Sequence, residues 1–227
     1  MNSSVIIFPG SNCDRDMAVA LKKFGFKNKM VWHEDSNLPK SDLVVLPGGF
    51  SYGDYLRCGS MASKSKIINS VINFAKSGGL LMGVCNGFQI LTETELLPGA
   101  LLRNKLSEFI CKNVYVKINN LENDYFNKIK KKTLELHIAH NEGNYFCSNN
   151  QMKEIDDNNQ IALSYCNKNG EIKDEYNPNG SIKNIAAIFN KEKNILGMMP
   201  HPERMIDKYL SGDDGSIFFE NLLNNLK

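Results

Sequence analysis

Residues 80–89 read LLMGVCNGFQ, an apolar run that leads through a Gly-Val-Cys-Asn-Gly turn into a helix-like segment. A thiol with one glycine two residues before it and another two residues after it, between a strand and a helix, is typical of a nucleophile elbow. The turn is tight, so side chains at Gly83 and Gly87 would collide with the neighbouring backbone. The N–H groups at the start of the helix point at the sulfur of Cys85 and favour its reactive thiolate. Cys85 is therefore the candidate nucleophile, with a core cysteine at a strand end as the alternative.

Short apolar segments alternate with helical patterns on the N-terminal side of this elbow. Predicted strands are Val5–Phe8, Lys29–Trp32, Leu43–Leu46 and Leu80–Val84, and predicted helices begin at Asp14 and span Ser60–Lys76. Continuous apolar strands that alternate with helices imply a buried parallel sheet.

The pattern of apolar and polar residues changes after Pro98-Gly99. Further short strands are predicted at Val114–Ile118, Leu134–Ile138, Ile161–Tyr165, Ile185–Phe189 and Ile195–Met199, followed by a helix over Gly215–Lys227. Asn169-Gly170 and Asn179-Gly180 are hairpin signals, and residues 119–132 carry no clear pattern. The sequence thus predicts an α/β fold: a mostly parallel central sheet flanked by helices, of flavodoxin-like type, with extra short antiparallel strands. We find no linker and expect a single domain over residues 1–227.

Composition excludes several classes of protein. The formal net charge of +2 argues against a nucleic-acid partner, and no apolar stretch reaches the length that spans a membrane. Six cysteines without a C-x-x-C pair, and no secretory leader, predict reduced thiols in the cytoplasm, five of the six being buried or half-buried. The four histidines lack zinc-ligand spacing with the cysteines, so no metal site is expected. Phosphate-binding glycine loops are missing as well, so we expect no ATP or dinucleotide cofactor in this chain.

A base and an acid stand two residues apart in Pro200-His201-Pro202-Glu203. If this segment is extended, His201 and Glu203 point to the same side. The carboxylate can then hydrogen-bond one ring nitrogen and leave the other free for Cys85. Taken alone, the segment fits a surface turn better. Together with Cys85, it indicates acyl transfer through a thioester.

Pro47-Gly48-Gly49 ends another buried strand. The N–H of Gly49 and the N–H of Asn86 are candidates for an oxyanion hole, although a tight turn is common for Gly-Gly. Gln89, one helical turn after the cysteine, joins Gly48 and His140 as a candidate substrate contact. The alternative for Gln89 is a polar residue on a half-exposed helix without a role in binding. The alternative for His140 is a side chain that simply lies at the end of a strand.

These motifs resemble the class I, triad-type glutamine amidotransferases, and more narrowly the glutaminase subunits of phosphoribosylformylglycinamidine synthase. The blocks that carry the resemblance are Phe8–Asp14, Pro47–Gly59, Gly83–Gln89, Ala139–Tyr145 and Met199–Arg204. They span nearly the whole chain in order, and the Gly-Gly-Phe-Ser-Tyr-Gly-Asp stretch is specific to these subunits. Asn141 departs from the pattern, where glycine is common.

The resemblance implies that Cys85 attacks the side-chain amide of glutamine, with His201 handling protons beside Glu203. It implies that the ammonia passes to an ATP-dependent synthetase subunit, where ATP and Mg act. That subunit converts formylglycinamide ribonucleotide to its amidine in purine biosynthesis, and a small third subunit assembles the complex. Asp54 and Arg57 belong to the distinctive block and are candidates for the mouth of the site or the synthetase contact, with a loop salt bridge as the alternative.

Two other functions compete with this one. Another cysteine hydrolase on the same kind of sheet, such as a peptidase-like or chaperone-like relative, shares the elbow but usually lacks the His-x-Glu pair. A catalytically silent assembly subunit is the other candidate, and the presence of all three triad residue types argues against it.

Overall fold

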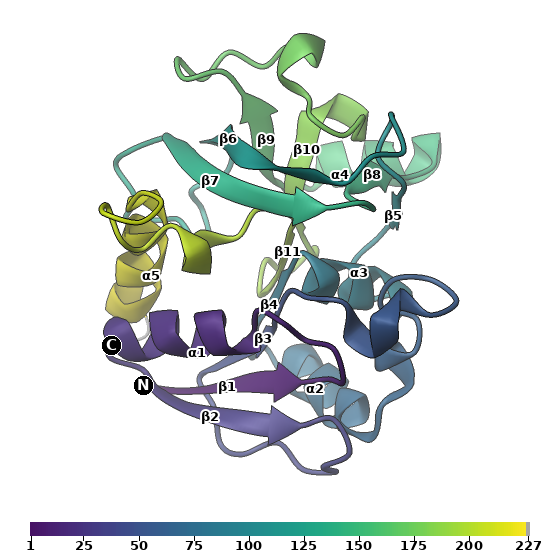
Figure 1. The fold of residues 1–227 in the computed structure, drawn as a ribbon, viewed down its shortest axis with the longest axis vertical. Helices are drawn as coiled ribbons and strands as arrows, with labels where there is room; N and C mark the ends of the chain where they lie inside the picture. The colour runs from purple at the N-terminus through teal and green to yellow at the C-terminus, as the bar shows by residue number, and fades with distance from the viewer. Residues whose placement is uncertain (226–227) are drawn as a thin grey trace.

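A central β-sheet dominates the computed structural model, which describes residues 1–225 (Figure 1). Its strands are β1 (Asn2–Ile7), β2 (Lys27–Trp32), β3 (Leu43–Leu46), β4 (Leu80–Val84), β6 (Ile110–Ile118), β7 (Thr133–His140), β9 (Ile161–Cys166), β10 (Ile185–Phe189) and β11 (Ile195–Met198). Within the described residues their order is β2-β1-β3-β4-β11-β10-β9-β6-β7. A separate antiparallel pair joins β5 (Ala100–Leu102) to β8 (Asn144–Phe146).

The sheet changes character along its width. Strands β2, β1, β3, β4 and β11 pair in parallel, and β3 and β4 are buried along their whole length. From β11 onward, β10, β9, β6 and β7 pair antiparallel and continue the same sheet. The predicted α/β class, with helices around a sheet of parallel and antiparallel strands, is confirmed. The two outermost antiparallel strands are longer than predicted, with 9 residues in β6 and 8 in β7.

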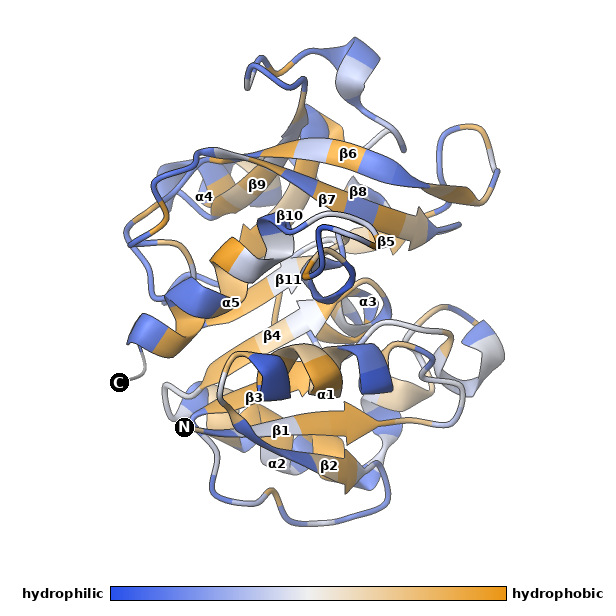
Figure 2. Cartoon of the chain, turned by 60° about the vertical axis from the view of Figure 1, so that its left-hand side comes forward, coloured by the Kyte–Doolittle hydropathy of each residue, from blue (hydrophilic) through white to orange (hydrophobic). Residues whose placement is uncertain are grey.

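Helices cover both faces of the sheet (Figure 1). They are α1 (Asp14–Lys23), α2 (Lys66–Lys76), α3 (Asn86–Glu93), α4 (Asn149–Asp157) and α5 (Asp214–Asn225). The end of α1 meets α5 on one face, where the rings of Phe24 and Phe219 stack 5.5 Å apart. On the other face lie α2 and α3. Hydrophobic colours dominate the strands β1 and β3 between these layers, whereas the loops around them are mainly hydrophilic (Figure 2). None of the helices in the described part of the chain is long and apolar enough to cross a membrane.

Three local predictions need correction. The helix expected from Ser60 begins only at Lys66, because Ser65 is extended (φ −64°, ψ 151°) and a 3₁₀ turn precedes it. Helix α4 was not predicted, although Ser148 and Gln151 form a reciprocal capping box at its start. The turn at Asn169-Gly170 closes locally and does not link paired strands directly, since the long segment 167–184 separates β9 from β10. Residues 226–227 of the predicted last helix lie outside the described residues.

Residues 119–132, for which the sequence showed no pattern, fold across the end of the sheet that lies away from the elbow. Tyr125 and Phe126 are fully buried. The Tyr125 hydroxyl lies 2.9 Å from the carbonyl oxygen of Leu81 and 2.8 Å from that of Asn194. The segment is therefore part of the core and is held by tertiary contacts rather than by its own periodicity.

The register of the parallel strands determines where the functional segments meet. Leu46 at the end of β3 pairs with Gly83, and Met198 at the end of β11 pairs with Val84. The carboxyl ends of β3, β4 and β11 are therefore level at one edge of the sheet. The segments that follow these strands carry the Gly-Gly turn, the cysteine and the histidine, so the fold brings all three together.

Candidate active site

Cys85 stands at the sharp bend between β4 and α3. Its backbone has φ 50° and ψ −105°, a conformation that costs free energy for a residue with a side chain and is concentrated at functional sites. A Cβ atom at Gly87 would lie 1.9 Å from the Leu46 carbonyl oxygen, and one at Gly83 would lie 2.6 Å from Gly87. The two glycines are thus required by close backbone packing, as the sequence predicted for an elbow.

His201 and Glu203 form a buried pair beside this elbow. His201 Nδ1 lies 2.6 Å from Glu203 Oε1, and the two residues are 1% and 3% exposed. Because the carboxylate accepts the proton of Nδ1, the neutral ring presents Nε2 as a hydrogen-bond acceptor. No residue within 1–225 bonds to Nε2. The backbone N–H of His201 donates to the His137 carbonyl at 2.8 Å, which ties the histidine segment to β7.

The charge state of His201 follows from its neighbours. Burial by itself lowers the pKa of His201, but the carboxylate of Glu203 and the sulfur of Cys85 more than offset it and hold the pKa well above its usual value. The raised pKa favours an imidazolium beside Cys85, and a cationic histidine next to the sulfur is the pairing that cysteine nucleophiles use. A hydrogen bond between the two is absent from the described residues, and catalytic bonds of this kind often tighten only when substrate binds.

The two glycines of the Gly48-Gly49 turn have different surroundings. A Cβ at Gly48 would lie 2.6 Å from Cε1 of His201, so the imidazole packs directly on this backbone. Gly49 has φ 129°, and a Cβ there would lie 2.4 Å from the backbone nitrogen of Asn12. Gly48 thus supports the histidine rather than lining the cavity at the cysteine, while Gly49 does line that cavity.

We expect Gly48→Ala to displace His201 and to lower kcat about 100-fold, since a shift of about 1 Å in a catalytic group has that effect. The substitution is free of backbone strain because Gly48 is not left-handed. Steady-state kinetics beside a thermal unfolding curve would check this. Gly78→Ala is the control for a loss of stability away from the site, since alanine there strains the left-handed backbone (φ 90°) but meets no atom within 4 Å. An unchanged kcat in a folded Gly48→Ala variant would contradict the packing argument.

The proposed oxyanion donors lie on the two sides of the nucleophile. Asn86 is the first residue of α3, where backbone N–H groups have no partner within the helix. Within residues 1–225, the N–H of Asn86 and the N–H of Gly49 make no hydrogen bond to another residue. Both remain available for an oxyanion, and their role stays a prediction.

A small cavity of about 130 Å³ adjoins Cys85 and contains several of the predicted residues. Its walls are Gly49, Phe50, Asp54, Cys58, Cys85, Gln89 and the segment from Ala139 to Glu142. The Gln89 amide is occupied on both sides: Nε2 donates to the Glu142 carbonyl at 2.7 Å, and Oε1 accepts from the Asn86 amide at 2.9 Å. Gln89 therefore holds the walls of the cavity together, and a direct contact with substrate requires one of these bonds to exchange.

His140 is the second polar residue predicted to contact substrate. It is 3% exposed, and its Nδ1 lies 3.1 Å from Asn104 Oδ1. Burial, followed by the charge of His201, lowers the pKa of His140 to about 4. The imidazole of His140 is neutral at physiological pH, in contrast to that of His201.

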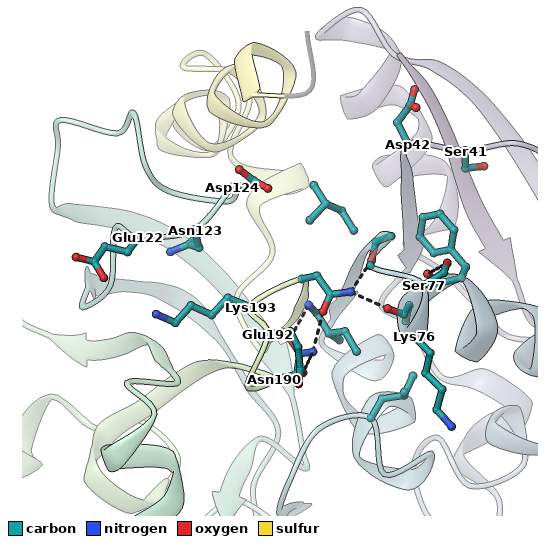
Figure 3. Close-up of a pocket in the computed structure, with 18 of the residues that line it drawn as sticks. Ser41, Asp42, Lys76, Ser77, Glu122, Asn123, Asp124, Asn190, Glu192 and Lys193 are labelled. Carbon is teal, nitrogen blue, oxygen red and sulfur yellow. Dashed lines mark hydrogen bonds between the residues drawn. The ribbon is translucent and has the colours of Figure 1, made fainter.

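A larger cavity than the one at Cys85 lies elsewhere in the described residues (Figure 3). This space of about 1310 Å³ is lined by residues that precede β3, β4 and β11, including Asp42, Gly79 and Asn194. Cys85 follows the opposite end of β4. The residues that line this cavity include no cysteine and no histidine, so we do not assign the reaction to it.

Cys13 and Arg204 complete the surroundings of the histidine, and the sequence pattern alone assigned them no role. Cys13 Sγ lies 3.1 Å from Arg204 Nη2, and Arg204 Nε lies 3.5 Å from Asp16 Oδ2. Cys13, His201 and Glu203 offer potential metal-ligand atoms within 4.8 Å of one another, but the adjacent guanidinium disfavours a cation there.

Two further expectations can be compared with the described residues. Five of the six cysteines are buried, as predicted, and Cys111 is the exposed one. Arg57 forms a bidentate salt bridge with Glu93, with both N–O distances at 2.6 Å. The loop salt bridge given as the alternative for Arg57 is thus present.

Known proteins resemble this chain over its whole length. A family model of the CobB/CobQ-like glutamine amidotransferase domain matches residues 1–212. The phosphoribosylformylglycinamidine synthase subunit PurQ of Pelagibacter ubique is 76% identical over 227 residues, which cover 100% of both chains. The subunit of the same name from Rhodospirillum rubrum is 45% identical over 229 residues, again over 100% of both.

Solved structures agree with these relatives. A chain in the structure of PurLQS from Thermotoga maritima superposes with a TM-score of 0.88 at 40% identity, and the match covers 100% of this chain and 99% of that one. A second Thermotoga maritima structure, a glutamine amidotransferase, matches at a TM-score of 0.60 with 14% identity and supports the fold alone. With its elbow cysteine and buried histidine–glutamate pair, the chain therefore belongs to the CobB/CobQ-like glutamine amidotransferases, and within them to the PurQ subunits of phosphoribosylformylglycinamidine synthase.

Proposed function

We propose that this chain is a glutaminase subunit that hydrolyses glutamine through a thioester on Cys85 and supplies ammonia to a partner synthetase. The observation that carries the proposal is the buried His201–Glu203 pair, 2.6 Å apart, beside a cysteine on a strained elbow. A paired imidazolium and thiolate next to a cavity suited to a small molecule is the arrangement that acyl transfer from an amide requires.

The reaction follows from the roles of the three side chains. The Cys85 thiolate attacks the side-chain carbonyl carbon of glutamine, and the oxyanion that forms accepts hydrogen bonds from the N–H groups of Gly49 and Asn86. His201 gives its proton to the amide nitrogen, the C–N bond breaks, and ammonia leaves. The neutral imidazole then takes a proton from water, the hydroxide attacks the thioester, and glutamate leaves as the thiolate is restored. Glu203 stabilises the imidazolium throughout.

The use of the ammonia is assigned by the kinship with PurQ subunits. We propose transfer to an ATP-dependent synthetase that converts formylglycinamide ribonucleotide to formylglycinamidine ribonucleotide in purine biosynthesis, in a complex with a small third subunit. In this proposal ATP and Mg belong to the synthetase, and the chain itself acts in the cytoplasm as a single amidotransferase domain over residues 1–227, without a cofactor or metal.

Exposed apolar side chains around the cavity, those of Phe50, Leu56, Leu106 and Phe109, form an apolar rim. This rim supports the proposal that a partner protein docks there. Phe50 lines the cavity and is 45% exposed, and its ring lies 6.5 Å from that of Phe109, itself 53% exposed. Leu56 and Leu106, on the neighbouring loops, are 84% and 73% exposed. Exposed apolar groups gathered around a site mark interaction surfaces. A synthetase seated on this rim would receive ammonia without its release to water.

Reconstitution with the synthetase and the third subunit tests this function. With ATP and formylglycinamide ribonucleotide present, we expect amidine formation driven by glutamine, with one glutamate released per amidine. Ammonium salts should replace glutamine as the nitrogen source for the assembled complex. Failure of the assembled complex to release glutamate from glutamine would contradict the proposal, and hydrolysis of peptides or esters instead would favour another cysteine hydrolase.

A further inference from the structure

We infer that Asp54 and Glu142 form the recognition site for the α-ammonium group of the substrate, so that the chain accepts free glutamine and rejects glutamine whose amino group is missing or acylated. This inference rests on the proposed glutaminase function and names what selects its substrate. Both carboxylates line the cavity of about 130 Å³ that also contains Cys85.

The two carboxylates share this cavity with a buried thiol, that of Cys58. Burial, and then the neighbouring groups of Glu142 and Asp54, raise the pKa of the Cys58 thiol far above its usual range. Burial also raises the pKa of Asp54, and the charge of Glu142 raises it further. Because both acids line one small cavity, the free protein holds two like charges there, and like charges repel.

The neighbouring cations leave this negative charge largely uncompensated. Arg57 is already engaged by Glu93 in a bidentate salt bridge. Arg103 Nε lies 3.9 Å from Glu142 Oε1, at the limit of an ion pair, and the Arg103 side chain is 73% exposed. Exposed pairs of this kind contribute little. A cation of ammonium size that enters the cavity would relieve the repulsion between the carboxylates and take their hydrogen bonds.

The backbone around Asp54 is built to aim its side chain. Tyr52, Gly53 and Asp54 have φ values of 53°, 66° and 56°, which are costly for Tyr52 and Asp54. The loop is held by the Tyr52 hydroxyl at 2.7 Å from His33 Nδ1, and by the Ser51 N–H, which donates to Asn86 Oδ1 at 3.1 Å. Residues kept in rare conformations by surrounding bonds are typical of ligand-binding positions.

A buried acceptor without a partner lines the same cavity. The amide nitrogen of Asn104 donates to the carbonyls of Glu108 and His140 at 2.8 and 2.9 Å, which leaves Asn104 Oδ1 to accept from His140 Nδ1. The neutral ring therefore carries its proton on Nδ1, and Nε2 is an acceptor. Within residues 1–225 this buried Nε2 has no partner. A buried acceptor left unpaired is costly, and a donor from a ligand would satisfy it.

The side chains of Asp54, Glu142 and His140 accept hydrogen bonds and carry no positive charge. Such walls suit a group that only donates and is positively charged, which in an amino acid is the α-ammonium. They exclude an N-acyl group, because the acyl carbonyl would meet the carboxylates and the positive charge would be lost. The same walls place the opposite end of glutamine, its amide, toward Cys85.

The test compares glutamine with glutaramate, which has the same amide but no amino group, and with N-acetylglutamine. Glutamate or glutarate release is measured with the chain in its complex with the synthetase. The parent should favour glutamine over both analogues, and Asp54→Asn and Glu142→Gln should each lower kcat/KM for glutamine about 10- to 100-fold, which is what a charge-assisted hydrogen bond contributes. Turnover of glutaramate should change little, so the preference for glutamine should collapse. Asp174→Asn and Glu175→Gln, at exposed positions, are the matched controls and should leave the preference unchanged.

The outcomes separate this inference from the proposed function. If the complex releases glutamate from glutamine but both variants keep the full preference over glutaramate, the ammonium site is wrong and the glutaminase function stands. If both variants lose turnover of glutamine and glutaramate equally while the ammonium-driven reaction persists, the carboxylates shape the cavity and do not recognise the amino group. If the parent releases no glutamate at all, the proposed function itself fails.

Discussion

Cys85→Ala is expected to lower glutamine-dependent turnover by about five to six orders of magnitude, the loss that removal of a catalytic nucleophile causes elsewhere. The sulfur is the atom that forms the thioester, and nothing else in the cavity of about 130 Å³ replaces it, because the other cysteine there, Cys58, has its thiol pKa raised. Alanine keeps the Cβ of the elbow, so the fold and the complex should persist. The measurement is amidine formation by the assembled complex, driven in turn by glutamine and by ammonium.

The pattern across the two nitrogen sources decides the interpretation. Loss with glutamine and retention with ammonium supports a nucleophile. Loss with both sources indicates that Cys85 is needed for the fold or the assembly, which a thermal unfolding curve would reveal. Cys111→Ala is the matched control, since Cys111 is exposed and outside the cavity, and it should keep both activities.

Glu203→Gln is expected to lower kcat about 10⁴-fold, as replacement of the carboxylate by an amide does in triad enzymes. The Glu203 carboxylate accepts from His201 Nδ1 at 2.6 Å, and both residues are buried. An amide in this place either presents its N–H₂ to Nδ1, which reverses the tautomer, or accepts from it without a charge. In both cases the imidazolium loses its stabilising partner.

The pH profile of this variant has a definite direction. Glu203 is a main cause of the raised pKa of His201, so the pKa must fall when the charge is removed. A lower pKa means that the imidazolium is lost at a lower pH, and the basic limb of kcat/KM should move in that direction. A profile with the same basic limb, or an unchanged rate, would remove Glu203 from the mechanism. Glu220→Gln, at an exposed position of α5, controls for the loss of one negative charge.

The sequence contained most of the information on the parallel half of the sheet. The apolar runs at β3 and β4 are buried on both faces, so they carry a signal that does not depend on distant partners. The elbow is equally local: the close approach of Gly87 to Leu46 requires a residue without a side chain, and the glycines show this in the sequence. Helix α4 was missed even though its capping box is readable as Ser148-x-x-Gln151.

Residues 119–132 show why other parts of the fold could not be predicted from local sequence patterns. The hydroxyl of Tyr125 finds its acceptors at Leu81 and Asn194, which are far away in the chain. Polar asparagines and lysines around a few buried aromatic residues have no period that distinguishes this arrangement from a solvated loop.

The residues of the candidate site also fall into two groups, those that the sequence predicts and those that only the tertiary structure brings together. Cys85, His201 and Glu203 are recognisable from residue type and spacing, because a tight turn and an extended His-Pro-Glu segment impose their geometry locally. The contact of Cys13 with Arg204, the packing of Gly48 on the His201 ring and the shared cavity of Asp54 with Glu142 join residues from separate segments. Their meeting depends on strand register and on the path of β7 beside the histidine. The sequence by itself determined which chemistry is available, since bond geometry and turn sterics act over a few residues. The tertiary structure decided which groups surround the reacting atoms, since burial and charge depend on neighbours that only the folded chain brings together.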